Sequence, residues 1–315
     1  MLGAALAALL ATATPPPPVD PLLVTIEADD ADRFARLFER TGGKPTAEQI
    51  QKDYLDPGSY GVHVFTPNRI ESAANLAAAV AKNPDGYRKA ITECLPVIKG
   101  TAAELRATYL ALHGLLPDRP LPHIYLVVGE GNSGGTAGPG AQVLGLETLC
   151  AIAKDADALR EVVRGFYAHE TVHTFQKESD TPSPGGVLLD SVLAEGAADF
   201  ITAMVTGRQP DAARAAWAAP REAELWTQLE ADLALTRGKD WKDLKRGTPG
   251  GTALRRWVTN YGDAPAGWPY ETGYWMGQRI WQRWYDRQPD KQAALRVMLE
   301  QRDPEAVLRE GRFGG

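Results

Sequence analysis

Cysteine is scarce in this chain, which has two such residues, Cys94 and Cys150, among 315. Neither lies in a CxxC pair, so a metal knuckle built from paired cysteines is excluded. The two thiols either pair as a disulfide, as export would allow, or stay apart as two buried side chains. Runs of five or more like charges are also missing, and the formal net charge is -6. These features argue against a nucleic-acid partner and against an anionic membrane surface.

A P-loop is missing as well, because no glycine-rich run leads into Gly-Lys-Ser or Gly-Lys-Thr. A GxGxxG pattern does occupy residues 129–134, directly after the apolar segment 123–128. In dinucleotide-binding folds the last glycine of this pattern opens a helix, whereas here Gly135 and the Gly-Pro-Gly run 138–140 prevent one. We therefore expect a long, flexible hairpin that joins strand 123–128 to a second strand at 141–146.

The N-terminus lacks positive charge, since no Lys or Arg precedes Arg33. Residues 1–13 are otherwise typical of a secretory signal peptide: they are almost wholly apolar, end in small residues and are too short to span a bilayer. Prolines 15–18 predict an extended spacer that holds a mature N-terminus away from the folded body. We expect residues 1–21 to be signal peptide and spacer, and the protein to be exported to the periplasm or the medium. The missing charge leaves a cytoplasmic location open.

The rest of the chain predicts an α+β protein that is mostly helical. Apolar residues three and four apart indicate helices across 30–116, and again at 155–177 and 188–205. The breaker-rich run before residue 187 suggests two subdomains. We expect residues 22–186 to form a helical and sheet subdomain, and residues 187–315 a helical one. No transmembrane segment is expected.

The clearest chemical motif is His169-Glu170-Thr171-Val172-His173, an HExxH within the predicted helix 155–177. Four residues make just over one helical turn, so both imidazoles project from one face and can hold a single ion about 2 Å from each nitrogen. Glu170 then lies beside the open position of the metal, where it can take a proton from bound water. The motif predicts a metal-dependent hydrolase.

No histidine follows His173, which excludes the third histidine of metzincins and requires a carboxylate to complete the site. Glu195, on the next predicted helix in Ala-Glu-Gly, is our candidate, because gluzincins supply such a glutamate roughly twenty residues downstream. Asp199 follows one turn later, where it can accept the outer N–H of His169 and fix its tautomer. The remaining histidines have no partner at ligand spacing, and we expect structural roles for them: His63, His113 and His123.

Together these segments resemble a domain family described as predicted zinc-dependent proteases of unknown physiological function. The resemblance covers roughly residues 30–311 and is carried by residues 51–60, the strand-glycine-strand unit, 169–176, 193–200 and Gly273-Tyr274 with Gly277. It implies a zincin-like, gluzincin-type fold with a small sheet beside the active-site helix. It also implies one Zn²⁺ bound by two histidines and one glutamate, and hydrolysis of peptide bonds.

Two further roles follow by analogy with gluzincins. An edge strand beside the active-site helix pairs with extended substrate, and residues 141–146 with Gly134, Gly135 and Thr136 are our candidates for it. A tyrosine or histidine from the C-terminal half stabilises the tetrahedral oxyanion, and Tyr274 is our candidate, with Tyr270 in reserve.

We thus expect a zinc metallopeptidase that acts on a peptide or protein, with Glu170 as the general base for metal-activated water. Two alternatives stay open. One is an exported zinc-binding protein without turnover, although a structural site needs no general base and usually completes its ligand set with Cys or His. The other is a hydrolase of non-peptide amides or esters on the same fold. The sequence carries no signal for the oligomeric state.

Overall fold

The structure is a computed structural model that describes residues 14–177 and 181–312. It is an α+β protein, mostly helical with one small mixed sheet, as the sequence predicts. The chain divides into two compact units after Thr174, whereas the sequence predicts a boundary after residue 186. The predicted signal peptide, residues 1–13, lies outside the described residues.

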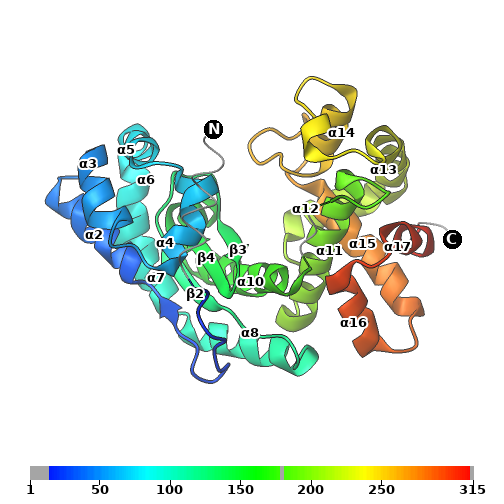
Figure 1. Ribbon diagram of the computed structural model, residues 1–315, viewed down its shortest axis with the longest axis horizontal. Coiled ribbons are helices and arrows are strands. Elements are labelled where there is room, and N and C mark those ends of the chain that lie inside the picture. The colour runs from blue at the N-terminus through cyan, green and yellow to red at the C-terminus, as the bar shows by residue number, and fades with distance from the viewer. Residues whose placement is uncertain (1–13, 178–180, 313–315) are drawn as a thin grey trace. The chain divides into compact units, whose positions relative to one another are not determined.

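The first unit contains the whole sheet and most of the short helices (Figure 1). Helices fill residues 30–116 as expected, and three of the segments there are π-helical turns. In chain order the elements are β1 (Ile26–Glu27), α2 (Asp29–Arg40), α3 (Ala47–Ile50), η1 (Gln51–Leu55), α4 (Tyr60–Phe65), η2 (Thr66–Ile70), α5 (Ala73–Lys82), α6 (Pro84–Lys89), η3 (Ala90–Cys94), α7 (Leu95–Lys99), α8 (Ala102–Leu115), β2 (His123–Val127), β3 (Gly135–Gly138), β4 (Ala141–Gly145), α9 (Leu146–Ile152) and α10 (Ala156–Phe175).

The strands lie in the order β1-β2-β4-β3. Strand β2 pairs with β4 in parallel, and β3 pairs with β4 in antiparallel fashion. The predicted long hairpin between β2 and β4 is therefore wrong, because strands joined by a hairpin are antiparallel. The glycine-rich segment instead crosses over, forms the short edge strand β3, and turns back at Pro139-Gly140 into β4.

Helices α4 and α10 cover opposite faces of the sheet. On one face, a side chain added at Gly61 of α4 would collide with Tyr125 of β2, so this helix lies directly on the strand. On the other face, the buried Gln142 of β4 donates to the carbonyl of Phe166 in α10 at 2.6 Å and accepts from the Thr171 hydroxyl at 3.0 Å. These bonds satisfy a buried amide and fix α10 against the sheet.

The proline run lies against the first unit rather than extending away from it. Val19 donates to the carbonyl of Leu121 at 3.1 Å, and the Pro17 carbonyl lies 3.0 Å from Nε2 of His123. A polyproline segment has no N–H groups at its prolines but keeps its carbonyls available as acceptors. The expected free spacer is therefore wrong for these residues.

A disulfide joins Cys94, at the end of η3, to Cys150 of α9. The Cα atoms of the two residues are 5.7 Å apart, within the range that this bond requires. Of the two possibilities left open by the sequence, the structure contains the paired one.

Buried polar side chains hold the glycine-rich segment in place through hydrogen bonds to its backbone. The carboxylate of Glu147 accepts from the backbone N–H of Gly129 at 3.0 Å and from that of Gly131 at 3.1 Å. The hydroxyl of Tyr87 donates to the Gly129 carbonyl at 2.7 Å. Burial raises the pKa of Glu147 above its ordinary 4.5, although the two backbone donors act in the opposite direction.

The second unit is entirely helical within residues 175–177 and 181–312. Its helix α11 (Val187–Thr206) is followed by Gly207, which takes the left-handed conformation common at helix C-termini. No helix among the described residues is long and apolar enough to cross a membrane. The elements are α11 (Val187–Thr206), α12 (Ala212–Ala218), η4 (Ala219–Arg221), α13 (Glu222–Thr236), η5 (Trp241–Asp243), α14 (Pro249–Trp257), α15 (Thr272–Arg287), α16 (Lys291–Glu300) and α17 (Pro304–Glu310).

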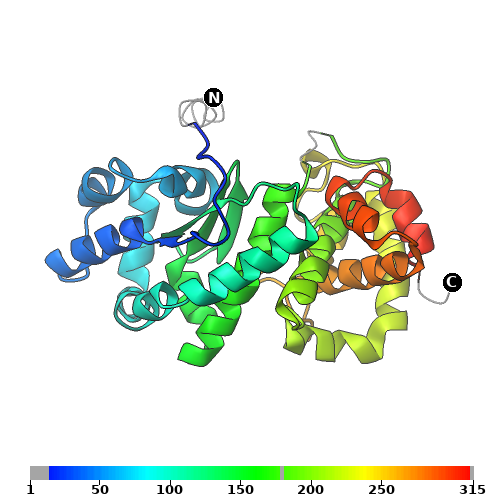
Figure 2. The ribbon, with the colours of Figure 1, turned by 90° about the horizontal axis from the view of Figure 1, so that it is seen from below.

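Helices α11 and α15 pack side by side at the centre of this unit, as Figures 1 and 2 both show. They approach through two glycines: a Cβ added at Gly196 would lie 2.2 Å from the backbone of Gly277, and one added at Gly277 would lie 1.8 Å from the Val192 carbonyl oxygen. Backbone atoms cannot move aside as a side chain can, so the crossing requires glycine on both helices.

Replacement of Gly277 by alanine should lower the free energy of unfolding by about 1–3 kcal/mol, because the added methyl overpacks this crossing. Gly165 provides the matched control, since it is also inside a helix but has no atom within 4 Å of its would-be Cβ. Gly165→Ala should instead raise stability by about 0.4–1 kcal/mol. Urea unfolding of the three proteins measures both values, and equal effects of the two substitutions would contradict the packing argument.

The raised pKa of Glu147 predicts a pH-dependent contribution to stability. The unfolded chain ionises this group near 4.5 and the folded chain only at higher pH, so ionised Glu147 opposes folding. Below the unfolded pKa, Glu147 is protonated in both states and does not oppose folding. The free energy of unfolding then falls as the pH rises through the folded pKa. Relative to Glu147→Gln, the wild type should therefore lose stability as the pH rises from 4.5 through the folded pKa. Urea unfolding across that range tests this, and a difference that is constant with pH would refute it.

Candidate metal centre

The two histidines of the HExxH motif lie one turn apart on α10, and both side chains are half-buried. Their Nε2 atoms are 3.0 Å apart, and the ring centroids are separated by 4.7 Å. The intervening Thr171 and Val172 are fully buried, and the Thr171 hydroxyl is bonded to Gln142 of the sheet. The sheet thus fixes the rotation of α10, and the helical spacing then brings His169 and His173 to one face.

Glu195 lies on α11, one residue before the glycine that permits the close approach to α15. Two side chains bond to carbonyls of this turn: Nε1 of Trp281 donates to Leu193 at 2.8 Å, and Nε2 of Gln176 donates to Ala194 at 2.7 Å. Glu195 itself is half-buried. The backbone on either side of Glu195 is therefore held by packing against α15 and by two side-chain hydrogen bonds.

The predicted ligands form a group that is close enough to hold a metal ion. One ring nitrogen from each of His169 and His173 and one carboxylate oxygen of Glu195 all lie within 4.8 Å of one another. Around a tetrahedral ion with bonds of 2.0–2.2 Å, the ligand atoms are about 3.3–3.6 Å apart, and the limit of 4.8 Å on this group includes that separation. Within the described part of the chain, His63, His113 and His123 belong to no such group.

Glu170 is 8% exposed and lies between the two histidines in the sequence. Its carboxylate is beside strand β3, where a Cβ added at Gly135 would come within 2.8 Å of Oε1. A side chain at position 135 would displace this carboxylate. The absence of a Cβ at Gly135 therefore leaves Glu170 the space that it occupies.

The predicted substrate-pairing residues lie at the edge of the sheet. Gly135 and Thr136 belong to β3, the outer strand, and Gly134 immediately precedes it. The assignment of 141–146 to the edge is wrong, because β4 lies between β2 and β3, and α9 already begins at residue 146. The edge thus consists of the glycine-rich strand, whose side chains are small.

Asp199 is 3% exposed and lies one turn after Glu195. Its Oδ2 is 3.7 Å from Nη1 of Arg214, which also donates to the Glu271 carbonyl at 3.1 Å. The same guanidinium lies over the ring of Tyr274, 5.2 Å from its centroid. Burial lowers the pKa of Arg214, but the negative charges of Asp199 and Asp211 outweigh burial, and the pKa is raised overall.

Arg214 is the residue of this group that the sequence did not reveal. It connects two residues selected from the sequence, Asp199 and Tyr274, which come from α11 and α15. Arg214 itself is on α12, in an alanine-rich segment without a motif. The reserve candidate, Tyr270, is 47% exposed and packs against the exposed ring of Tyr261, 5.1 Å between centroids. Tyr274 is half-buried.

The group formed by His169, His173 and Glu195 predicts one metal ion per chain. His173→Ala and Glu195→Ala should each weaken metal binding by more than about 100-fold, which exceeds the loss typical of changing an outer hydrogen-bond partner. His113→Ala, at an exposed position, is the control and should retain wild-type affinity. Metal analysis after dialysis, followed by Zn²⁺ titration against a chelating dye, measures stoichiometry and affinity. Full metal content in the Glu195→Ala protein would remove Glu195 from the ligand set.

Comparisons with known proteins add no relative. No model of a protein family matches the chain, and no curated protein or solved structure shows significant similarity to it.

Proposed function

We propose that this protein is a zinc-dependent peptidase. The observation that carries the proposal is the grouping of one donor atom each from His169, His173 and Glu195, with a buried carboxylate, Glu170, between the histidines in the sequence. Two imidazoles and one carboxylate suit Zn²⁺. Three protein ligands leave a fourth position for water or substrate, which is the arrangement of catalytic rather than structural zinc sites.

Glu170 is the proposed general base. Bound zinc would lower the pKa of a water molecule and polarise the scissile carbonyl. Glu170 would accept the proton from that water and pass it to the leaving amine. Its place beside Gly135 supports this role, because substrate paired with β3 would lie next to the carboxylate.

Strand β3 is the proposed binding edge for extended peptide. An outer strand offers unpaired backbone N–H and C=O groups, which a substrate backbone can complete as an additional strand. The small residues of β3, Gly-Thr-Ala-Gly, leave room for substrate side chains. This mode of binding favours peptides over isolated amides or esters, because the affinity comes from several successive peptide groups.

Asp199, Arg214 and Tyr274 form the proposed supporting group. Asp199 would accept from the outer N–H of His169, and Arg214 would hold the Asp199 carboxylate in place. Tyr274 would donate its hydroxyl to the oxyanion, and the guanidinium over its ring supports the proposal by restricting the ring.

Export is part of the same proposal. The disulfide between Cys94 and Cys150 supports it, because such bonds persist in oxidising compartments and are rare in the cytosol.

Glu170→Gln should keep its zinc and lose peptide turnover by about 10²–10⁴-fold, the range that general-base catalysis contributes. The assay is a digest of a peptide library by the zinc-loaded protein, with metal content measured on the same sample. Wild-type rates in the Glu170→Gln protein would require another base. Tyr274→Phe enters the same assay, where unchanged turnover would remove Tyr274 from the mechanism.

The substrates in this assay also separate the alternatives. Cleavage of peptides that stops with a chelator supports the peptidase, whereas cleavage of a parallel ester and amide panel alone would support a non-peptide hydrolase. If the zinc-loaded wild type cleaved neither kind of substrate, a zinc-binding protein without catalytic activity would be the better description. Glu161→Gln, an exposed carboxylate of α10, is the matched control and should retain full turnover and metal.

A further inference from the structure

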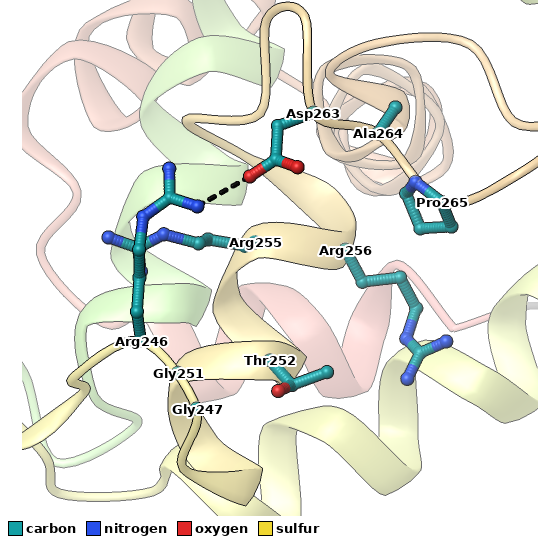
Figure 3. Close-up of a pocket in the computed structure, with 9 residues that line it drawn as sticks. All are labelled: Arg246, Gly247, Gly251, Thr252, Arg255, Arg256, Asp263, Ala264 and Pro265. Atoms are coloured by element: carbon teal, nitrogen blue, oxygen red, sulfur yellow. Dashed lines mark hydrogen bonds and ion pairs between the residues drawn. The ribbon is translucent and has the colours of Figure 1, made fainter.

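A cavity rich in arginine lies in the second unit, outside the proposed metal centre. Its volume is about 420 Å³, within the range typical of small-molecule sites. Nine residues line it, and three are arginines: Arg246, Arg255 and Arg256. Figure 3 shows the side chains of Arg246 and Arg255 extending to one side of the cavity and that of Arg256 to the other.

The walls of the cavity are held by backbone contacts. A Cβ added at Gly251 of α14 would lie 2.0 Å from the Lys245 carbonyl oxygen, so the segment that carries Arg246 packs directly on the helix. At the other end of α14, the buried Asn260 side chain donates to the carbonyl of Arg255 at 2.9 Å. The carbonyl of Asn260 accepts from Asp263 at 2.8 Å, which fixes the opposing loop.

The three arginines differ in their partners. Nε of Arg256 donates to the buried carboxylate of Asp232 at 2.8 Å. Arg246 pairs with Asp263 at 2.5 Å, but both side chains are more than half exposed, and such a pair contributes little in water. Arg255 has no carboxylate partner among the described residues, and its buried Nε and Nη1 have no hydrogen-bond acceptor there.

A guanidinium with buried, unsatisfied N–H groups is costly unless an acceptor binds it. An anion is the acceptor that suits Arg255 best, because the guanidinium is always charged and bonds most strongly to an ionised acceptor. Phosphate fits better than carboxylate: it carries about two negative charges and three strong acceptor oxygens, enough to engage Arg255 together with Arg246 and the hydroxyl of Thr252, which also lines the cavity. The volume leaves space for atoms attached to the phosphate.

We propose that this cavity binds a phosphate group, either as inorganic phosphate or as the phosphomonoester of a small molecule. Arg255 is the principal ligand, and Arg246 contributes after release from Asp263. The site does not depend on the proposed zinc chemistry.

Binding is measured by isothermal titration and by thermal shift with inorganic phosphate, O-phosphoserine and phenyl phosphate, each against chloride of equal ionic strength. Arg255→Ala should weaken binding at least about tenfold, because it removes the principal donors. Asp263→Asn should strengthen binding about three- to tenfold, because it frees Arg246. Arg302→Ala, whose side chain is 72% exposed, should change nothing.

The three probes identify the source of the phosphate. Equal affinities support a site for inorganic phosphate, and tighter binding of the organic probes, with none of serine, supports a phosphomonoester. Two outcomes would overturn the proposal: no probe binds beyond the chloride control, or Arg255→Ala binds as the wild type does. Should Arg255→Ala fail to fold, the Asp263→Asn protein decides, because unchanged or weaker binding there contradicts the site.

Discussion

The bond between Gln142 and α10 is the contact on which the proposed chemistry depends. A single amide accepts from Thr171 and donates to the Phe166 carbonyl, so it fixes both the position and the rotation of the helix. With the helix turned this way, the histidines share one face and Glu170 lies at the sheet edge. A buried amide without these partners would be costly, so the sheet and the helix stabilise each other.

In each unit, one glycine permits a close approach next to a residue of the proposed site. Gly135 makes room for the Glu170 carboxylate, and Gly196 follows Glu195 in the crossing with α15. The two positions differ in what the glycine faces. At Gly135 the neighbour is a side chain, whereas at Gly196 it is backbone, which cannot rearrange.

Much of the fold and of the candidate site could be predicted from the sequence. The helix that carries His169 and His173, and the one that carries Glu195, follow from apolar spacing. Strand β3 was hard to predict, because Gly-Thr-Ala-Gly has two glycines, which are depleted in strands, and only one β-branched residue. The parallel pairing of β2 and β4 also escaped prediction, since it depends on contacts made across the sheet. Arg214 reaches Asp199 only through the packing of α12, which no local pattern encodes.

The bridge between Cys94 and Cys150 closes a covalent ring of the backbone that contains β2, β3 and β4 but leaves β1 and α10 outside. One cut in the exposed part of the glycine-rich segment would open this ring without separating the pieces. A nicked chain would then keep its size until a reductant is added. Cleavage by a protease at this segment would therefore leave the parallel strands β2 and β4 tethered to each other.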